Sequence, residues 1–220
     1  MKYGFIKVAA ASPALRVADC RYNAERAAEM MQQAAAAGAH LLVLPELGLT
    51  GYTCGDLLLQ PTLQQGALSA LQTLLSVSAE LPLTTITGLP LSVEGKLYNC
   101  AAVLHQGQIL GVVPKTNLPN YGEFYEARWF TPAPAGTRTI DLGRAFDTAE
   151  LFGYRAAYRH RVCRGGPYVL VVFLFFLVVV MVVMVVVVRL HSLGYLLVQQ
   201  RNRVRHAESL RIRRGFQHAL

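Results

Sequence analysis

The first 113 residues alternate between short apolar runs and longer stretches of helix-forming residues. The apolar runs are four to eight residues long, and they predict β-strands at 5–9, 41–44, 84–88, 97–104 and 108–113. Leu41–Leu44 is apolar throughout, which is typical of a strand covered on both faces, and Pro45 ends it. The stretches 22–37 and 57–79 predict helices, the second broken near Pro61.

Residues at the ends of these elements support the assignment. Asp19 is a suitable N-cap for the first helix, and Gly38 supplies the left-handed position that follows a helix C-terminus. The segment 105–108 predicts a tight hairpin in which Gly107 takes a positive φ. Strand, helix, strand, helix, strand and hairpin together indicate an α/β protein with helices stacked on a sheet.

This pattern stops near Gly143. Residues 168–188 form a 21-residue segment without charge, glycine or proline, which meets the length of about 20 needed for a transmembrane helix. We therefore divide the chain into a partial domain at 1–143, an arginine-rich linker at 144–167, a hydrophobic segment at 168–188 and a basic tail at 189–220. The tail is expected to be disordered or helical.

Charge divides at the same place. Residues 1–147 hold ten Lys and Arg against eleven Asp and Glu, a net charge of −1, whereas 148–220 hold eleven Arg against two Glu, a net charge of +9. The basic balance belongs to the tail, so it does not indicate nucleic-acid binding by the domain. Lysine also ends at Lys115. Two interpretations remain open: 168–188 is a membrane anchor, or a reading-frame shift after about residue 143 produced the tail. A third, that the basic tail binds RNA or anionic lipid, is disfavoured because 199–220 has only Phe216 as an aromatic residue to interleave with its arginines.

Two charged residues come directly after predicted strands, each preceded by a proline. Glu46 follows the second strand and Lys115 follows the last strand of the hairpin. Sites are built at the carboxyl ends of strands in α/β sheets, so the two side chains could face one pocket. There a glutamate can take a proton from a nucleophile, and a lysine can stabilise an oxyanion. From position alone, a structural ion pair or two separate surface charges would be the favoured explanation.

Four segments carry a family resemblance: LPELGLTGY at 44–52, CGDLLLQ at 54–60, GLPLSVEGKLYNCAAVLHQGQILGVVPK at 88–115 and VVPKTNLPNYGEFYEARWF at 112–130. They resemble the nitrilase, or carbon-nitrogen hydrolase, superfamily. The motif YGEFYEARWF is more specific than the superfamily as a whole, and it looks like the glutaminase domain of bacterial glutamine-dependent NAD synthetases. The resemblance implies a nitrilase-like α-β-β-α sandwich, incomplete in this chain, followed by a hydrophobic helix and a basic tail.

The resemblance also implies roles for individual residues. Glu46 would be the general base and Lys115 the residue that stabilises the oxyanion, while Glu126 would help to position Lys115. Tyr121 would line the glutamine pocket, with Tyr52 close to it. Ordinary packing explains Tyr52 equally well.

The nucleophile is the missing part. In the family a cysteine follows the lysine by several tens of residues, in a context that resembles ICEDLW, and no such segment occurs here. Cys163 is the only cysteine after Lys115, and its context, RVCRGG, differs. We expect Cys20, Cys54 and Cys100 to be core or loop thiols. The nucleophilic cysteine is thus taken to be absent, and the chain to be catalytically incomplete.

The expected partners follow from the family. They are glutamine, a synthetase domain outside this sequence that would hold ATP and Mg, and further copies in a homo-oligomer. No cofactor is expected in this chain, and the six dispersed histidines indicate no metal site. Cysteines without CxxC spacing fit a cytoplasmic protein, membrane-associated if 168–188 is a genuine span. The alternative from another class is a membrane-tethered, non-catalytic interaction protein on a nitrilase-like scaffold.

Overall fold

The computed structural model describes residues 6–142 and 149–152. They all lie in one compact unit, Met1–Phe176. The predicted hydrophobic segment 168–188 and the basic tail 189–220 lie outside the described residues, as does the linker 144–167 apart from its strand at 149–152. In the part of the chain that is described, no helix is both long and apolar enough to span a membrane.

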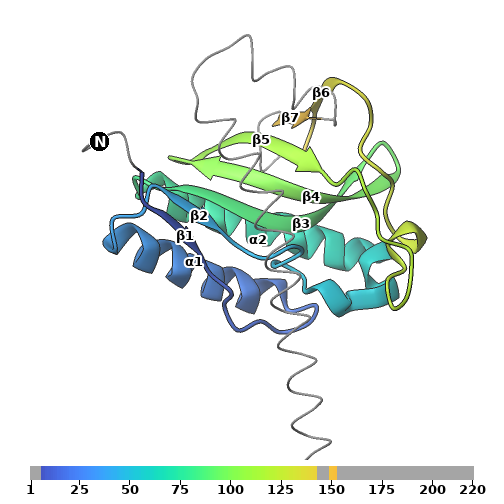
Figure 1. Cartoon of the computed structure of the whole chain (residues 1–220), viewed down its shortest axis with the longest axis horizontal. Helices are drawn as coiled ribbons and strands as arrows, with labels where there is room; N and C mark the ends of the chain where they lie inside the picture. Colours follow the sequence, from blue (N-terminus) through green and yellow to red (C-terminus); the bar gives the residue numbers. More distant parts are fainter. Residues whose placement is uncertain (1–5, 143–148, 153–220) are drawn as a thin grey trace, which may run out of the picture. The chain divides into compact units, whose positions relative to one another are not determined.

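The described residues of this unit form one mixed sheet of seven strands (Figure 1). Its spatial order is β1 (Val8–Ala10), β2 (Leu41–Val43), β3 (Thr84–Val93), β4 (Lys96–His105), β5 (Gln108–Pro114), β7 (Ala149–Phe152) and β6 (Thr137–Ile140). β1, β2 and β3 are parallel, whereas β3, β4 and β5 form an antiparallel meander. β7 pairs parallel to β5 and antiparallel to β6. The α/β class predicted from the sequence is therefore confirmed.

Two helices pack together and cover the sheet (Figure 1). α1 runs over Cys20–Ala36 and α2 over Pro61–Ala79, and a short 3-10 segment, η1 (Tyr52–Leu59), precedes α2. Met31 of α1 and Leu71 and Leu74 of α2 are fully buried. Burial of each such side chain stabilises the fold by about 1.5–3 kcal/mol, so the contact of the helices with the sheet contributes substantially to stability.

The ends of α1 form as the sequence predicts. The Asp19 carboxylate accepts a hydrogen bond from the Tyr22 N–H over 3.1 Å and caps the N-terminus. At the other end Gly38 has φ +74°, and the N–H groups of Gly38 and Ala39 donate to Ala35 and Ala34. These two bonds form a Schellman motif, which satisfies the last helix carbonyls. The helix starts two residues earlier than predicted, because the Asp19 cap lies directly before Cys20.

Both hairpins of the meander use two residues with positive φ. Gln106 and Gly107, with φ +46° and +76°, join β4 to β5 as predicted. The turn between β3 and β4 was not predicted; Glu94 and Gly95 make it with φ +51° and +74°. Such turns match the right-handed twist of the paired strands. They pair β3 with β4 up to Val93, so β3 continues well beyond the predicted end at residue 88.

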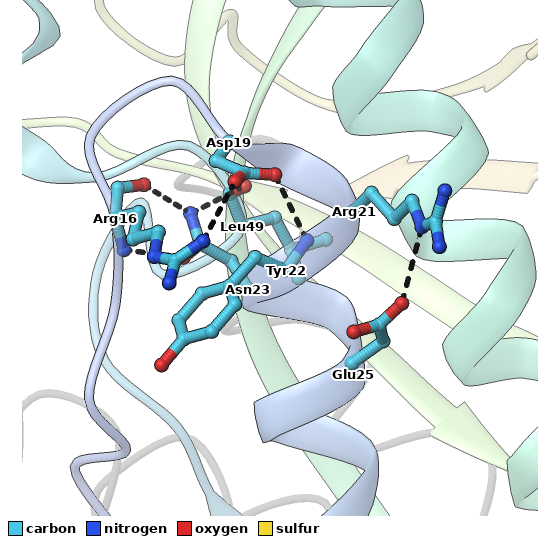
Figure 2. A network of polar contacts seen from close by, with 7 residues as sticks. All are labelled: Arg16, Asp19, Arg21, Tyr22, Asn23, Glu25 and Leu49. Carbon is cyan, nitrogen blue, oxygen red and sulfur yellow. Dashed lines mark hydrogen bonds and ion pairs between the residues drawn. The ribbon is translucent and has the colours of Figure 1, made fainter.

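A buried asparagine of α1 anchors two loops that are distant in sequence (Figure 2). The Asn23 amide oxygen accepts from the Arg16 N–H over 2.8 Å. Its Nδ2 group donates to the Arg16 carbonyl over 2.8 Å and to the Leu49 carbonyl over 3.2 Å. Asn23 is 2% exposed, so these bonds are shielded from water. They fix the loop after β2, which carries Glu46.

Candidate active site

Glu46 lies in a tight turn at the carboxyl end of β2. The Gly48 N–H donates to the Pro45 carbonyl, and Leu47 has a left-handed φ of +50°. The turn docks on β3, because the Leu49 N–H donates to the Gly88 carbonyl over 3.2 Å. A non-glycine residue in this backbone region is strained, which is common where a side chain must be aimed.

Gly88 of β3 makes this docking possible. A Cβ atom at this position would lie 2.4 Å from the Leu47 nitrogen, 2.7 Å from the Pro45 oxygen and 2.8 Å from the Glu46 Cα. All three are backbone atoms, so no side-chain rotation relieves the clash. The sequence interpretation missed this role, although a glycine inside a strand is a known sign of a close backbone approach.

Lys115 joins two carboxylates at the end of β5. Its Nζ donates to Glu46 Oε1 over 2.7 Å and to Glu126 Oε1 over 2.8 Å. The side chains are 13% exposed for Glu46, 21% for Lys115 and 1% for Glu126. The structure thus brings together three of the residues singled out from the sequence. Removing one partner of such a shielded group costs about 3–5 kcal/mol.

Glu126 enters the site from η2 (Glu126–Arg128), a 3-10 turn after the meander. Its backbone is held at both ends, since its N–H donates to Pro119 and its carbonyl accepts from Phe130. The Tyr52 hydroxyl donates to Glu126 Oε1 over 2.7 Å. Burial of the hydroxyl is the larger cause, and the hydrogen bond to Glu126 the next, of a Tyr52 pKa that lies well above its usual range. Tyr52 therefore remains a phenol that donates to the carboxylate.

Asn99 of β4 is a further member of the cluster, and the sequence interpretation missed it. Its Nδ2 donates to Glu46 Oε1 over 2.5 Å, and its carbonyl accepts from the Lys115 N–H over 2.7 Å. Asn99 is 4% exposed. The sequence feature that could have revealed Asn99 is its amide side chain, the only one within the apolar run 97–104.

Two carboxylate oxygens of the cluster remain without a partner among the described residues. Glu46 Oε2 and Glu126 Oε2 are both buried and accept no hydrogen bond there. An unsatisfied buried acceptor costs about 1–3 kcal/mol, and more when it is charged. Such groups in a folded protein call for an explanation, and a catalytic role is one of the standard ones. Glu46 Oε2 in particular has lone pairs free to accept a proton.

An exposed ion pair holds the two loops of the site together. Arg128 donates from Nε and Nη2 to the two Asp56 oxygens over 2.7 and 2.8 Å, and Trp129 Nε1 donates to Oδ1 over 2.8 Å. The hydrogen bonds from Arg128, and to a smaller extent the one from Trp129, hold the pKa of Asp56 well below its usual range. Because Asp56 belongs to η1 and Arg128 to η2, the contact ties the Tyr52 loop to the Glu126 loop.

Tyr121 lies apart from this network. Its side chain is 73% exposed, and its ring packs edge-on against Phe124 with centroids 5.8 Å apart. Among the described residues it is not one of the groups hydrogen-bonded around Lys115. Its place in a glutamine pocket stays a prediction.

The three described cysteines are buried thiols. Burial, with a smaller contribution from Cys54, raises the pKa of Cys20 to about 11. Burial also raises the pKa of Cys54 and that of Cys100. Cys54 donates to the Thr50 carbonyl over 3.0 Å. A thiol is nucleophilic only as a thiolate, so none of these three is prepared for attack at neutral pH. Cys163 lies outside the described residues.

Comparison with known proteins gives consistent results. The sequence profile of the carbon-nitrogen hydrolase family matches residues 7–163. The glutamine-dependent NAD(+) synthetase of Mycobacterium tuberculosis H37Rv is 40% identical over 154 residues, which are 69% of this chain and 23% of that protein. The enzyme of the same name from Acinetobacter baylyi is 38% identical over 127 residues, 57% of this chain and 23% of that protein.

Solved structures agree. The glutamine-dependent NAD(+) synthetase from Cytophaga hutchinsonii matches with a TM-score of 0.60 and 30% identity, over 66% of this chain and 25% of that one. An amidase from Nesterenkonia sp., at 22% identity, shares the fold with a TM-score of 0.51, over 67% of this chain and 54% of that one. The chain spans about a quarter of the length of the synthetases it matches. The match over residues 7–163 shows that this chain belongs to the carbon-nitrogen hydrolase family.

Proposed function

We propose that this chain carries the general base and the oxyanion-stabilising lysine of a glutamine-hydrolysing domain, of the kind that glutamine-dependent NAD synthetases contain. The observation that carries the proposal is the position of Lys115 Nζ between Glu46 and Glu126. Glu46 lies 69 residues before Lys115 and Glu126 lies 11 residues after it, and the three side chains converge there in a partly shielded place. The similarity to the synthetases supports glutamine as the substrate.

In the proposed reaction, Glu46 takes a proton from a thiol, and the thiolate attacks the side-chain amide carbon of glutamine. The carbonyl electron pair moves to oxygen and forms an oxyanion. An ammonium group has three donors, and two of those on Lys115 are used by Glu46 and Glu126, which leaves one for the oxyanion. The protonated Glu46 then gives its proton to the departing nitrogen, and ammonia and a thioester result. Water then attacks the thioester carbon while Glu46 accepts its proton. The C–S bond breaks, glutamate is released, and the proton on Glu46 passes to the departing thiolate, which regenerates the thiol.

The thiol is the part that this chain is proposed to lack. Cys20, Cys54 and Cys100 are buried, with pKa values raised above the ordinary one. Cys163 lacks the acidic follower of the family nucleophile. We therefore propose that the chain alone is catalytically incomplete.

The same proposal extends to the architecture. The sheet with α1 and α2 on it would be one half of an α-β-β-α sandwich. The ammonia would pass to a synthetase domain outside this sequence, and ATP and Mg would bind in that domain. Family members with this arrangement would act as homo-oligomers.

Ammonia release from L-glutamine by the purified full chain tests the reaction. We expect no release above that of Glu46→Gln, because no activated thiol is available. Release that disappears in both Glu46→Gln and Cys163→Ala would overturn the incompleteness and support the mechanism. Release that persists in Glu46→Gln would contradict the role of the base.

Binding of L-glutamine by calorimetry tests the substrate separately. Saturable binding is expected for the wild type and for Glu80→Gln, an exposed residue that serves as the matched control. Lys115→Met should weaken it at least about tenfold, the effect of losing one charge-assisted hydrogen bond. If the wild type shows no saturable binding, glutamine is not the substrate.

A further inference from the structure

Asn99 contacts both Glu46 and Lys115 of the proposed centre. Its side-chain amide donates to Glu46 Oε1, and its backbone carbonyl accepts from the Lys115 N–H. Successive side chains of a strand point to opposite faces, so Asn99 leaves β4 on the face opposite Cys100. Burying an amide within the run 97–104 is costly unless the amide is hydrogen-bonded. Its position therefore points to a requirement beyond packing.

The bond from Asn99 makes the two oxygens of Glu46 unequal. Oε1 receives two donors, Asn99 Nδ2 and Lys115 Nζ, whereas Oε2 receives none among the described residues. The terminal torsion of a glutamate has a broad energy minimum, so a carboxylate held by a flexible lysine alone can rotate. A second donor from a rigid strand restricts that rotation. It leaves Oε2 as the oxygen with free lone pairs.

We propose that Asn99 is a positioning residue that orients the Glu46 carboxylate so that Oε2 receives the proton of the nucleophile. Through its carbonyl it also fixes the backbone of Lys115 relative to the base. An amide suits this position because it donates to a carboxylate without neutralising it. Aspartate would repel Glu46, and leucine would fill the space without donating. The identity of the proton donor rests on the proposed function, but the orientation of Glu46 does not.

A double-mutant cycle in the full chain tests the hydrogen bond between Asn99 and Glu46. Asn99→Asp should lower Tm by roughly 5–10 °C, because two carboxylates then lie at hydrogen-bond distance in a shielded place. Adding Glu46→Gln should restore most of this loss, since the amide at position 46 can donate to the carboxylate at position 99. The matched control combines Glu46→Gln with Asn120→Asp, an exposed position where no such compensation arises. A double variant as unstable as Asn99→Asp alone would overturn the proposal.

Positioning is measured through the Lys115 ammonium group by ¹H–¹⁵N spectroscopy. The chain has four lysines, Lys2, Lys7, Lys96 and Lys115, so Lys115→Met assigns its signal. Asn99→Leu keeps the bulk but removes the donor, and freer rotation of Glu46 should speed solvent exchange of the Lys115 ammonium protons by about tenfold or more. Exchange as slow as in the wild type means that Asn99 only fills space, which overturns the proposal. Neither readout uses glutamine, so both remain informative if the glutaminase proposal fails.

Discussion

Replacing Gly88 with alanine tests how the turn that carries Glu46 is held. The added Cβ would lie 2.4–2.8 Å from three backbone atoms of residues 45–47, about 1 Å closer than ordinary contact. Overpacking of this kind costs about 1–3 kcal/mol. Moving the turn away from β3 also weakens the bond from Leu49 to the Gly88 carbonyl, for about 1 kcal/mol more. The total of about 2–4 kcal/mol corresponds to a fall in Tm of roughly 10 °C.

Thermal unfolding followed by circular dichroism measures this effect, with Gly66→Ala as the matched control. Gly66 lies inside α2, where alanine is favoured over glycine by up to about 1 kcal/mol, and its Cβ would meet only side-chain atoms of Cys20, the nearest at 3.3 Å. We expect Gly66→Ala to leave Tm unchanged or raise it slightly. If Gly88→Ala is as stable as the control, the close approach of the Glu46 turn to β3 is wrong.

Three further predictions concern the cap, the ion cluster and the thiols. Asp19→Ala should lower the free energy of unfolding in urea by about 1 kcal/mol, whereas Asp19→Asn should leave it unchanged, because an asparagine side-chain oxygen can accept the same bond from the Tyr22 N–H. An equal fall in both variants would show that Asp19 does not stabilise the helix as an N-cap. Lys115→Met should lower the free energy of unfolding by about 3–5 kcal/mol, because it leaves the charges of Glu46 and Glu126 without a cation. Adding Glu126→Gln should recover part of this loss. If the effects of the two substitutions on the free energy of unfolding simply add, Lys115 and Glu126 are not energetically coupled. The pKa of the Cys20 thiol is 9.0 in the unfolded chain and about 11 in the folded one, so the free energy of unfolding should fall as the pH rises from 9.0 to about 11. Cys20→Ala should flatten this dependence on pH. An unchanged dependence in that variant would contradict the raised pKa.

The sequence predicted several features that depend on a local structural rule. The Asp19 cap, the Gly38 terminus and the turn at Gly107 each depend on neighbours within a few residues, and the structure has all three. The apolar pattern places Glu46 and Lys115 at strand ends, whereas the roles predicted for them came from the family resemblance. The Glu94–Gly95 turn was equally local, and the pattern of turn residues there was overlooked.

Apart from the expected proximity of Glu46 and Lys115, the sequence pattern did not predict side-chain contacts between distant segments. Asn99 and Glu46 are 53 residues apart, and Asp56 and Arg128 are 72 apart. Their bonds depend on how β2, β4 and the two loops are placed in space, which no periodicity encodes. Tyr52 was associated with the substrate pocket, and the structure adds the bond of its hydroxyl to Glu126.

The most direct test of the proposed centre is a titration of the chain with L-glutamine, observed at the ammonium signal of Lys115. If Lys115 stabilises the substrate carbonyl between Glu46 and Glu126, its signal should shift saturably, while that of Lys96, an exposed lysine on β4, should not move. Binding read at this one group depends on no thiol, so the result does not require catalysis. A Lys115 signal that stays in place, or that moves in step with Lys96, would contradict the assignment of this cluster as a glutamine site.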